Sequence, residues 1–138
     1  MRFLVVDDSS TMRRIIINAL NKLGHDQIVE ASNGREGLER LATSDVDFII
    51  TDWNMPYMNG IEFIRTVRTI AKSKCTPVLV VTTHAATNDI VEALRAGVNS
   101  YIVKPFSVET FRDKIDAVCD KHSSSAGRCD FTDRRAIS

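Results

Sequence analysis

The sequence predicts an α/β fold: a five-stranded parallel sheet with helices on both faces. Two observations predict it. Short apolar runs alternate with segments of helical period five times along the chain, and three of the runs are nearly continuous, as in strands buried on both faces. A repeating strand–helix pattern gives a parallel sheet, because right-handed crossovers leave few alternatives. At 138 residues, one domain accounts for the chain.

The expected strands are the five short apolar runs. They lie at residues 3–6, 27–31, 48–51, 78–81 and 101–103. β-Branched and large apolar residues make up nearly all of three of these runs, which predicts strands that are buried on both faces of the sheet.

The expected helices carry apolar residues spaced three and four apart. In chain order the stripes are Met12, Ile15, Ile16, Ala19, Leu20 and Leu23; Leu38, Leu41 and Ala42; Ile61, Ile64, Val67 and Ala71, widened by Phe63 and Ile70; Ile90, Val91, Ala93 and Leu94; and Val108, Phe111, Ile115, Val118 and Cys119. Gly24 and Gly97 are the expected stops of the first and fourth helices, and Ser107 is the expected N-cap of the fifth.

Composition narrows the class of protein. Eighteen basic residues balance eighteen acidic ones, so we expect no non-specific nucleic-acid binding. No apolar run has the length of a membrane span or a signal peptide, so we expect a cytoplasmic protein without membrane insertion. Cys75, Cys119 and Cys129 lack metal-ligand spacing and are expected to be reduced thiols. The domain is expected at residues 1–122, followed by a disordered tail at 123–138.

Polar side chains end four of the predicted strands, where burial requires none. Asp7 and Asp8 follow the first strand, Asp52 the third, Thr82 the fourth and Lys104 the fifth. Because function collects at the carboxyl ends of parallel strands, we expect these side chains to converge. Three neighbouring carboxylates favour a hard divalent cation such as Mg²⁺, which also binds phosphate oxygens. A carboxylate can then act as the nucleophile that forms an aspartyl phosphate.

Each residue has a simpler explanation when taken alone. Asp8 and the serines after it could cap the next helix, and Asp52 could start a loop. Thr82 suits a strand, and Lys104 with Pro105 suits a turn. The joint arrangement, with each residue at the end of a different strand, is much rarer and favours a site.

On these residues the chain resembles the response-regulator receiver family, and within it the chemotaxis proteins. The resemblance spans roughly residues 2–121 without a large gap. It is carried by Asp-Trp-Asn-Met-Pro-Tyr-Met-Asn-Gly at 52–60, Val-Thr at 81–82 and Tyr-Ile-Val-Lys-Pro-Phe at 101–106. It implies the flavodoxin-like strand order 2-1-3-4-5 and a phosphorylation switch.

The family pattern implies a role for each matching residue. Asp52 is the expected phosphoacceptor, with Lys104 and Thr82 contacting the phosphoryl group. The expected Mg²⁺ ligands are Asp7, Asp8, Asp52 and the backbone carbonyl of Asn54. Tyr101 is the expected switch residue, which turns inward when phosphorylation shifts the population between two packings.

The resemblance also implies a partner-binding face on the fourth helix, fifth strand and fifth helix. Its expected contributors are Ala85, Ile90, Tyr101, Val103, Phe106 and Lys114. For Ile90 and Val103, plain core packing is an equal alternative.

Two positions near Thr82 depart from the commonest family pattern. Thr83 stands where receivers usually have a smaller residue, and we expect it to slow labelling by small phosphodonors. His84 stands where chemotaxis receivers of enteric bacteria have an acid. His84 and Asn54 occupy the positions that tune dephosphorylation; the alternative for His84 is an ordinary exposed loop residue.

The leading hypothesis is a single-domain response regulator, monomeric, that catalyses its own phosphorylation and dephosphorylation without being a conventional enzyme. A histidine kinase of the chemotaxis type is the expected donor, a flagellar motor switch protein the expected target, and a phosphatase a further candidate partner. Alternatives are a phosphate sink, a phosphorelay intermediate or a fragment of a larger regulator. A haloacid-dehalogenase phosphatase would need Asp-x-Asp after the first strand, and a flavodoxin would need a Ser/Thr-rich phosphate loop.

Overall fold

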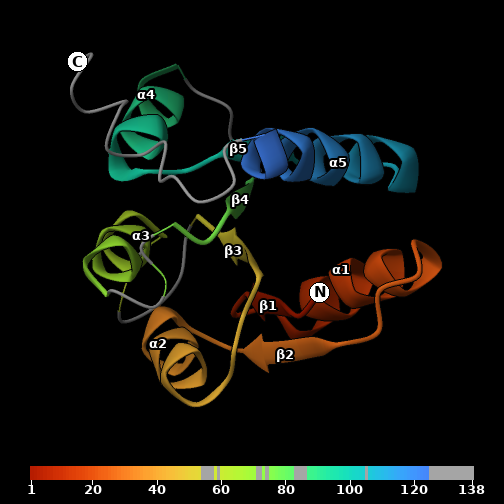
Figure 1. Ribbon diagram of the computed structural model, residues 1–138, viewed down its shortest axis with the longest axis horizontal. Helices are drawn as coiled ribbons and strands as arrows, with labels where there is room; N and C mark the ends of the chain where they lie inside the picture. The colour runs from red at the N-terminus through yellow and green to blue at the C-terminus, as the bar shows by residue number, and fades with distance from the viewer. Residues whose placement is uncertain are drawn as a thin grey trace.

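Strands and helices alternate from Phe3 to Ser124 (Figure 1). The structure is a computed structural model that describes residues 1–53, 58, 60–70, 73, 75–82, 87–104 and 106–124, with only the backbone of 87–90 and 120–124. The strands are β1 (Phe3–Val6), β2 (Ile28–Ala31), β3 (Phe48–Asp52), β4 (Val78–Thr82) and β5 (Ser100–Val103). The helices are α1 (Ser10–Lys22), α2 (Gly34–Thr43), α3 (Gly60–Thr69), α4 (Thr87–Ala96) and α5 (Val108–Ser124).

The strands form one parallel sheet in the order β2-β1-β3-β4-β5, which confirms the predicted fold and strand order. β1, β3 and β4 are buried along their whole length, as their continuous apolar sequences predict. In the register, Val6 of β1 pairs with Thr51 of β3. The next residue along each chain is therefore an aspartate, Asp7 on one side and Asp52 on the other.

Helices cover both faces of this sheet (Figure 1). On one face, Leu20 of α1 and Phe111 of α5 belong to the buried cluster that also holds Val5 and Ile50. On the other face, α2, α3 and α4 contribute to a second cluster, in which Phe63 of α3 is fully buried. Each such buried side chain stabilises the fold by roughly 1.5–3 kcal/mol.

Local signals define several helix ends. The side chain of Ser9 accepts a hydrogen bond of 3.2 Å from the first turn of α1, and that of Ser107 accepts one of 3.1 Å from the first turn of α5. Gly24, with φ of 91°, follows α1, and Gly97, with φ of 108°, follows α4. These torsions favour glycine, which confirms both predicted stops.

The predicted apolar stripes are wider than the buried helix faces. Among the described residues, four that belong to these stripes are exposed: Ile15, Ala42, Val91 and Leu94. In α1 the adjacent Ile16 is buried, while 47% of the Ile15 surface is exposed. Successive helical residues turn by about 100°, so a residue at the margin of a stripe can point away from the sheet. All four residues lie in helices, as the spacing predicts, but their side chains are not part of the buried helix faces.

A buried arginine ties α3 to the amino-terminal ends of β4 and β5. The Arg68 guanidinium donates to the carbonyl oxygen of Gly97 at 2.7 Å, to that of Thr76 at 2.6 Å and to that of Ser73 at 3.2 Å. It also donates at 3.1 Å to Oδ1 of Asn99. A buried charge is tolerated only when its donors are satisfied, and these carbonyl groups satisfy them.

The expectation of three reduced cysteines is wrong for Cys75, which is disulfide-bonded. Cys119 is not part of a disulfide. Linear spacing does not show which cysteines approach within bonding geometry once the chain folds, so the sequence could not reveal this bond.

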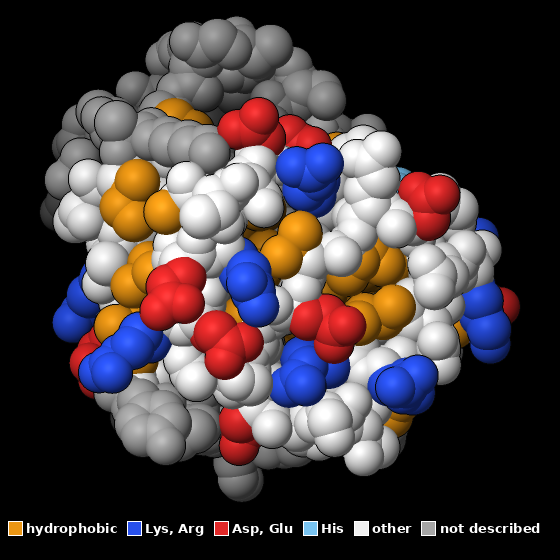
Figure 2. Space-filling model, turned by 90° about the horizontal axis from the view of Figure 1, so that it is seen from below, with side chains coloured by type: hydrophobic (Ala, Val, Ile, Leu, Met, Phe, Trp, Pro, Cys, Tyr) orange, Lys and Arg blue, Asp and Glu red, His pale blue; other side chains and the backbone are white. Residues whose placement is uncertain are grey.

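In the face shown in Figure 2, acidic and basic side chains are interspersed without a large patch of one sign. Among the described residues, no helix combines the length and the apolar sequence needed to cross a membrane. α5 extends to Ser124, slightly beyond the expected domain end at 122; the rest of the expected tail lies outside the described residues.

Candidate functional site

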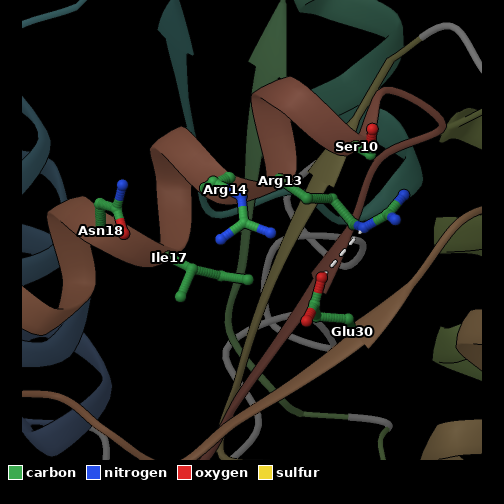
Figure 3. Close-up of a pocket in the computed structure, with 6 residues that line it drawn as sticks. All are labelled: Ser10, Arg13, Arg14, Ile17, Asn18 and Glu30. Atoms are coloured by element: carbon green, nitrogen blue, oxygen red, sulfur yellow. Dashed lines mark hydrogen bonds and ion pairs between the residues drawn. The ribbon is translucent and has the colours of Figure 1, made fainter.

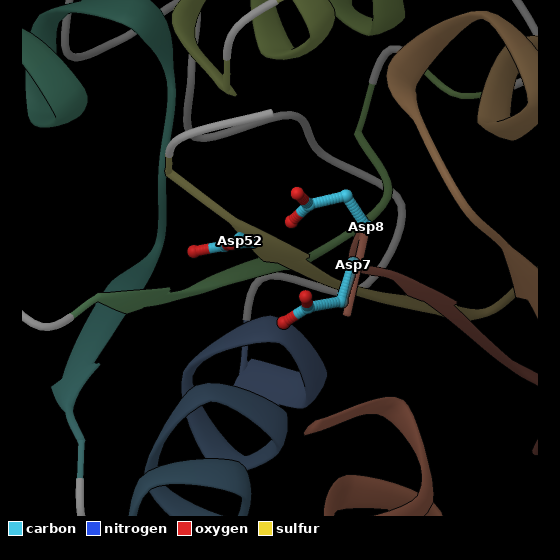
Figure 4. Close-up of side chains that lie close together, drawn as sticks. All are labelled: Asp7, Asp8 and Asp52. Atoms are coloured by element: carbon cyan, nitrogen blue, oxygen red, sulfur yellow. The ribbon is translucent and has the colours of Figure 1, made fainter. Parts of the chain in front are cut away.

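Three carboxyl groups meet at the carboxyl-terminal edge of the sheet. Asp7 and Asp8 follow β1, and Asp52 is the last residue of β3. One carboxylate oxygen from each lies within 4.8 Å of the others (Figure 4). Asp7 and Asp52 are buried, whereas Asp8 is exposed. The structure therefore brings together the acidic residues expected from the sequence. The cluster that they form is open to solvent on the side of Asp8.

Hydrogen bonds with β2, with the turn after β1 and with α1 hold Asp7 in place. Its main-chain N–H donates to Ala31 of β2 at 3.1 Å, and its Oδ1 accepts from the N–H of Ser9 at 2.8 Å. Its carbonyl oxygen accepts from Nη1 of Arg13 at 2.6 Å. Sequence reasoning missed Arg13, although a basic residue one turn into the helix after an acidic pair is a readable signal.

Lys104 supplies the positive charge of the site. Its ammonium nitrogen lies 3.5 Å from Oδ2 of Asp7 and 3.5 Å from Oδ1 of Asp52. Only 12% of the lysine side chain is exposed, so solvent screens these pairs less than it would at the surface. The main-chain N–H of Lys104 donates to the carbonyl of Thr82 at 2.7 Å, which links the ends of β5 and β4.

Burial and mutual repulsion perturb the two inner carboxyl groups. Burial raises the pKa of Asp7, and Lys104 opposes this shift. Burial also raises the pKa of Asp52, with the Asp7 charge as the next cause, and Lys104 again opposes it. A divalent cation would offset both causes, and carboxylate oxygens are the donors that Mg²⁺ takes. The residues present therefore fit a Mg²⁺ ion.

Thr82 and Tyr101 belong to the opposite face of the sheet from α1 and α5. Side chains alternate between faces along a strand, so Thr82 shares the face of Val80, which packs in the cluster under α2, α3 and α4. Tyr101 pairs with Val80 in the register and packs, half-buried, against the same cluster. The two residues expected to respond to phosphorylation thus lie on the α4 side.

The structure describes the side chains of four of the six residues expected on the partner-binding face: Tyr101, Val103, Phe106 and Lys114. Lys114 of α5 places its ammonium nitrogen 5.2 Å from the centre of the Tyr101 ring, a cation–π geometry. Val103 is 37% exposed, so of the two alternatives for this residue, exposure at the surface is correct and core packing is not. The Phe106 ring stacks on that of Phe111 with centroids 5.1 Å apart, which anchors the start of α5.

Several predicted residues lie outside the described part of the chain. They are Asn54, the expected source of a carbonyl ligand, and Thr83, His84 and Ala85 beyond β4. For Ile90 the backbone belongs to α4, but its side chain is outside the description. Their roles remain predictions from the sequence.

A pocket lies beside the site, between α1 and β2 (Figure 3). It is lined by Ser10, Arg13, Arg14, Ile17, Asn18 and Glu30. Arg13 pairs with Glu30 across it, with Nε 3.1 Å from Oε1. Since Arg13 also contacts the Asp7 carbonyl, this ion pair connects β2 to the acidic cluster.

The fold and the three carboxylates with their lysine define a doubly wound α/β domain with an acidic cluster at the carboxyl ends of its strands. The model of the response regulator receiver domain matches residues 3–116, and the chain belongs to that family.

Similar proteins carry chemotaxis names. The chain is 47% identical over 119 residues to the chemotaxis protein CheY1 of Helicobacter pylori, an alignment that covers 86% of this chain and 96% of that protein. It is 50% identical over 119 residues to the chemotaxis protein CheY homolog of Campylobacter jejuni, covering 86% and 92%. The solved structure of Vibrio cholerae CheY4 matches with a TM-score of 0.80 at 35% identity, covering 85% of this chain and 97% of that chain.

Proposed function

We propose that this receiver domain is a phosphorylation switch in which Asp52 accepts a phosphoryl group from a histidine kinase. The observation that supports this most directly is the position of Lys104, whose ammonium group lies 3.5 Å from both Asp7 and Asp52. A fixed cation between two buried carboxylates is suited to a group that gains negative charge during the reaction.

The chemistry is a displacement at phosphorus. An oxygen of the Asp52 carboxylate attacks the phosphorus of a phosphohistidine, and an O–P bond forms as the N–P bond breaks. The imidazole nitrogen leaves with the electron pair of that bond and takes up a proton from solvent. The protein contributes position and charge, which is the main protein contribution to phosphoryl transfer.

Mg²⁺ is the proposed cofactor, held by Asp7, Asp8, Asp52 and the carbonyl of Asn54. When bound, it neutralises charge on the phosphoryl oxygens. Lys104 contacts another phosphoryl oxygen, and the Thr82 hydroxyl donates to the phosphoryl group after phosphorylation. His84 and Asn54 tune the rate at which water removes the group.

The output is a change at the face formed by α4, β5 and α5. Thr82 and Tyr101 lie on the α4 side of the sheet, so a contact between Thr82 and the phosphoryl group favours an inward Tyr101 and alters this face. Ala85, Ile90, Val103, Phe106 and Lys114 are the further proposed contributors.

The proposed pathway is chemotaxis, on the strength of the names of the similar proteins. The donor is then a histidine kinase of the chemotaxis type, and the target a flagellar motor switch protein, both in the cytoplasm. A pull-down with the phosphorylated and unphosphorylated protein tests this pathway. Equal capture of the motor protein by both forms contradicts it.

The fluorescence of Trp53, the single tryptophan of the chain, tests the chemical step. We expect Mg²⁺ with beryllofluoride, a phosphoryl analogue, to change the emission because Trp53 adjoins the acceptor. Asp52→Ala is expected to abolish the response, whereas Asp116→Ala, at an exposed carboxylate on α5, is expected to keep it. A full response in the Asp52→Ala variant would exclude Asp52 as the acceptor.

A further inference from the structure

We infer that Gly60 is a positioning residue for Asp52: its missing side chain lets α3 begin in contact with the Asp52–Trp53 peptide and so keeps the Asp52 carboxylate in the acidic cluster. The inference rests on the proposed function of Asp52 and adds a residue with no chemical group of its own.

The space around Gly60 is closed by main chain. A Cβ atom built there would lie 2.9 Å from the carbonyl oxygen of Asp52, 3.0 Å from that of Trp53 and 3.1 Å from the Trp53 Cα. Distances this short require something to move. All three atoms belong to the backbone, so no side-chain rotation relieves the contact.

Backbone torsion does not explain a glycine at this position. Among the described residues, the glycines with positive φ are Gly24 and Gly97. Gly60 begins a helix, and inside helices other residues are favoured over glycine. The close approach to Asp52 and Trp53 is therefore the feature that requires glycine.

A displaced Asp52 carbonyl would move the reacting carboxylate. That carbonyl and the N–H of Trp53 belong to one planar peptide unit. The same N–H donates to Oδ1 of Asp52 at 2.8 Å, and the N–H of Gly60 donates to the Trp53 carbonyl at 2.9 Å. Pushing the carbonyl away thus rotates the donor that orients the carboxylate, and changes its position relative to Asp7 and Lys104.

The other glycines whose surroundings the structure describes, Gly24, Gly34 and Gly37, lack this relationship. A Cβ at Gly37 would meet the Phe63 ring at 2.9 Å and a Val6 methyl at 3.2 Å. These are side-chain atoms, and the main chain of the site is untouched. Gly37→Ala is therefore a matched control, with equal crowding at a helical glycine.

The test compares Gly60→Ala, Gly37→Ala and the wild-type protein in Mg²⁺ titrations followed by Trp53 emission. Loss of support around a metal ligand typically weakens metal affinity about 10- to 100-fold. We expect a weakening of that size for Gly60→Ala. For Gly37→Ala we expect a lower melting temperature and a Mg²⁺ midpoint within about twofold of wild type. A Gly60→Ala midpoint within that range would overturn the inference.

If Gly60→Ala does not fold, amide hydrogen exchange in the wild-type protein tests the inference instead. In the wild-type protein, the Gly60 amide is expected to exchange with solvent at least about a hundredfold more slowly than an unprotected amide, because it donates to Trp53. Exchange at the unprotected rate would overturn the inference. A wild-type protein that responds to neither Mg²⁺ nor beryllofluoride would instead contradict the proposed function.

Discussion

The ammonium group of Lys104 stands 3.5 Å from Oδ1 of Asp52, which is one of the three carboxylates that could hold a cation. The lysine thus has two opposing effects. It stabilises the ionised carboxylates of the metal-free protein, but it repels a divalent cation that approaches the same oxygens.

Lys104→Met should separate these effects. We expect Mg²⁺ to bind about tenfold more tightly, because a positive charge at this distance is removed from a partly buried site. Labelling of Asp52 by a phosphodonor should nevertheless slow markedly, since the charge that attracts phosphoryl oxygens is lost. Fluorescence titration measures the first effect and single-turnover labelling the second. Lys22→Met, at the exposed end of α1, is the control; weaker Mg²⁺ binding by Lys104→Met would contradict the prediction.

Asp7→Asn should stabilise the metal-free protein at neutral pH. Burial raises the pKa of Asp7, so the folded state binds the proton more tightly than the unfolded state does. The free energy of unfolding therefore falls as pH rises from about 4 through the raised pKa, and the aspartate destabilises the fold above it.

Urea unfolding in EDTA measures this effect. At pH 7 the asparagine variant should be more stable than the wild-type protein, and the gain should shrink as pH falls towards 4. Added Mg²⁺ should stabilise the wild-type protein more than the variant. The exposed Asp26 offers a control in Asp26→Asn. If the stability advantage of Asp7→Asn instead grew as the pH fell, the prediction would be contradicted.

Arg68→Ala should cost about 3 kcal/mol of unfolding free energy. The substitution leaves the carbonyl groups of Ser73, Thr76 and Gly97 without the donor that satisfies them. Chemical denaturation measures the loss. Arg68→Lys should recover only part of it, because one ammonium group cannot reproduce the guanidinium geometry. Arg65→Ala, at an exposed position on α3, should change stability by less than about 0.5 kcal/mol.

Ile15 and Ile16 form a neighbouring pair with opposite environments. Ile16→Ala should lower the unfolding free energy by about 2–4 kcal/mol, because it leaves a cavity between α1 and the sheet. Ile15→Ala should cost less than about 0.5 kcal/mol, since its side chain is largely exposed. Equal losses in urea unfolding would show that Ile15 is covered in solution.

The sequence predicted the sheet and the acidic cluster because both depend on local patterns. Continuous apolar runs identify buried strands, and polar residues directly after them meet wherever parallel strands end side by side, as Asp7 and Asp52 do. Neither prediction needs knowledge of how a side chain packs.

What escaped prediction depends on contacts between distant parts of the chain. Leu94 satisfies the apolar spacing of a buried helix face and is nevertheless exposed. Arg68 reads as an ordinary surface arginine, yet its partners Gly97 and Asn99 come from another helix–strand connection. The need for glycine at position 60 arises only when α3 meets the end of β3.

The two ends of β5 differ in how they are held, because the described hydrogen bonds of Arg68 reach only one of them. At its start, Asn99 accepts from both Arg68 and the main chain of Val78, so that end is fastened to α3 and β4. At its far end lies Lys104, next to the carboxylates. We therefore expect the main chain of β5 to be held more firmly near Asn99 than near Lys104, so that a rearrangement that begins at Lys104 moves the backbone of Tyr101 less than that of the lysine.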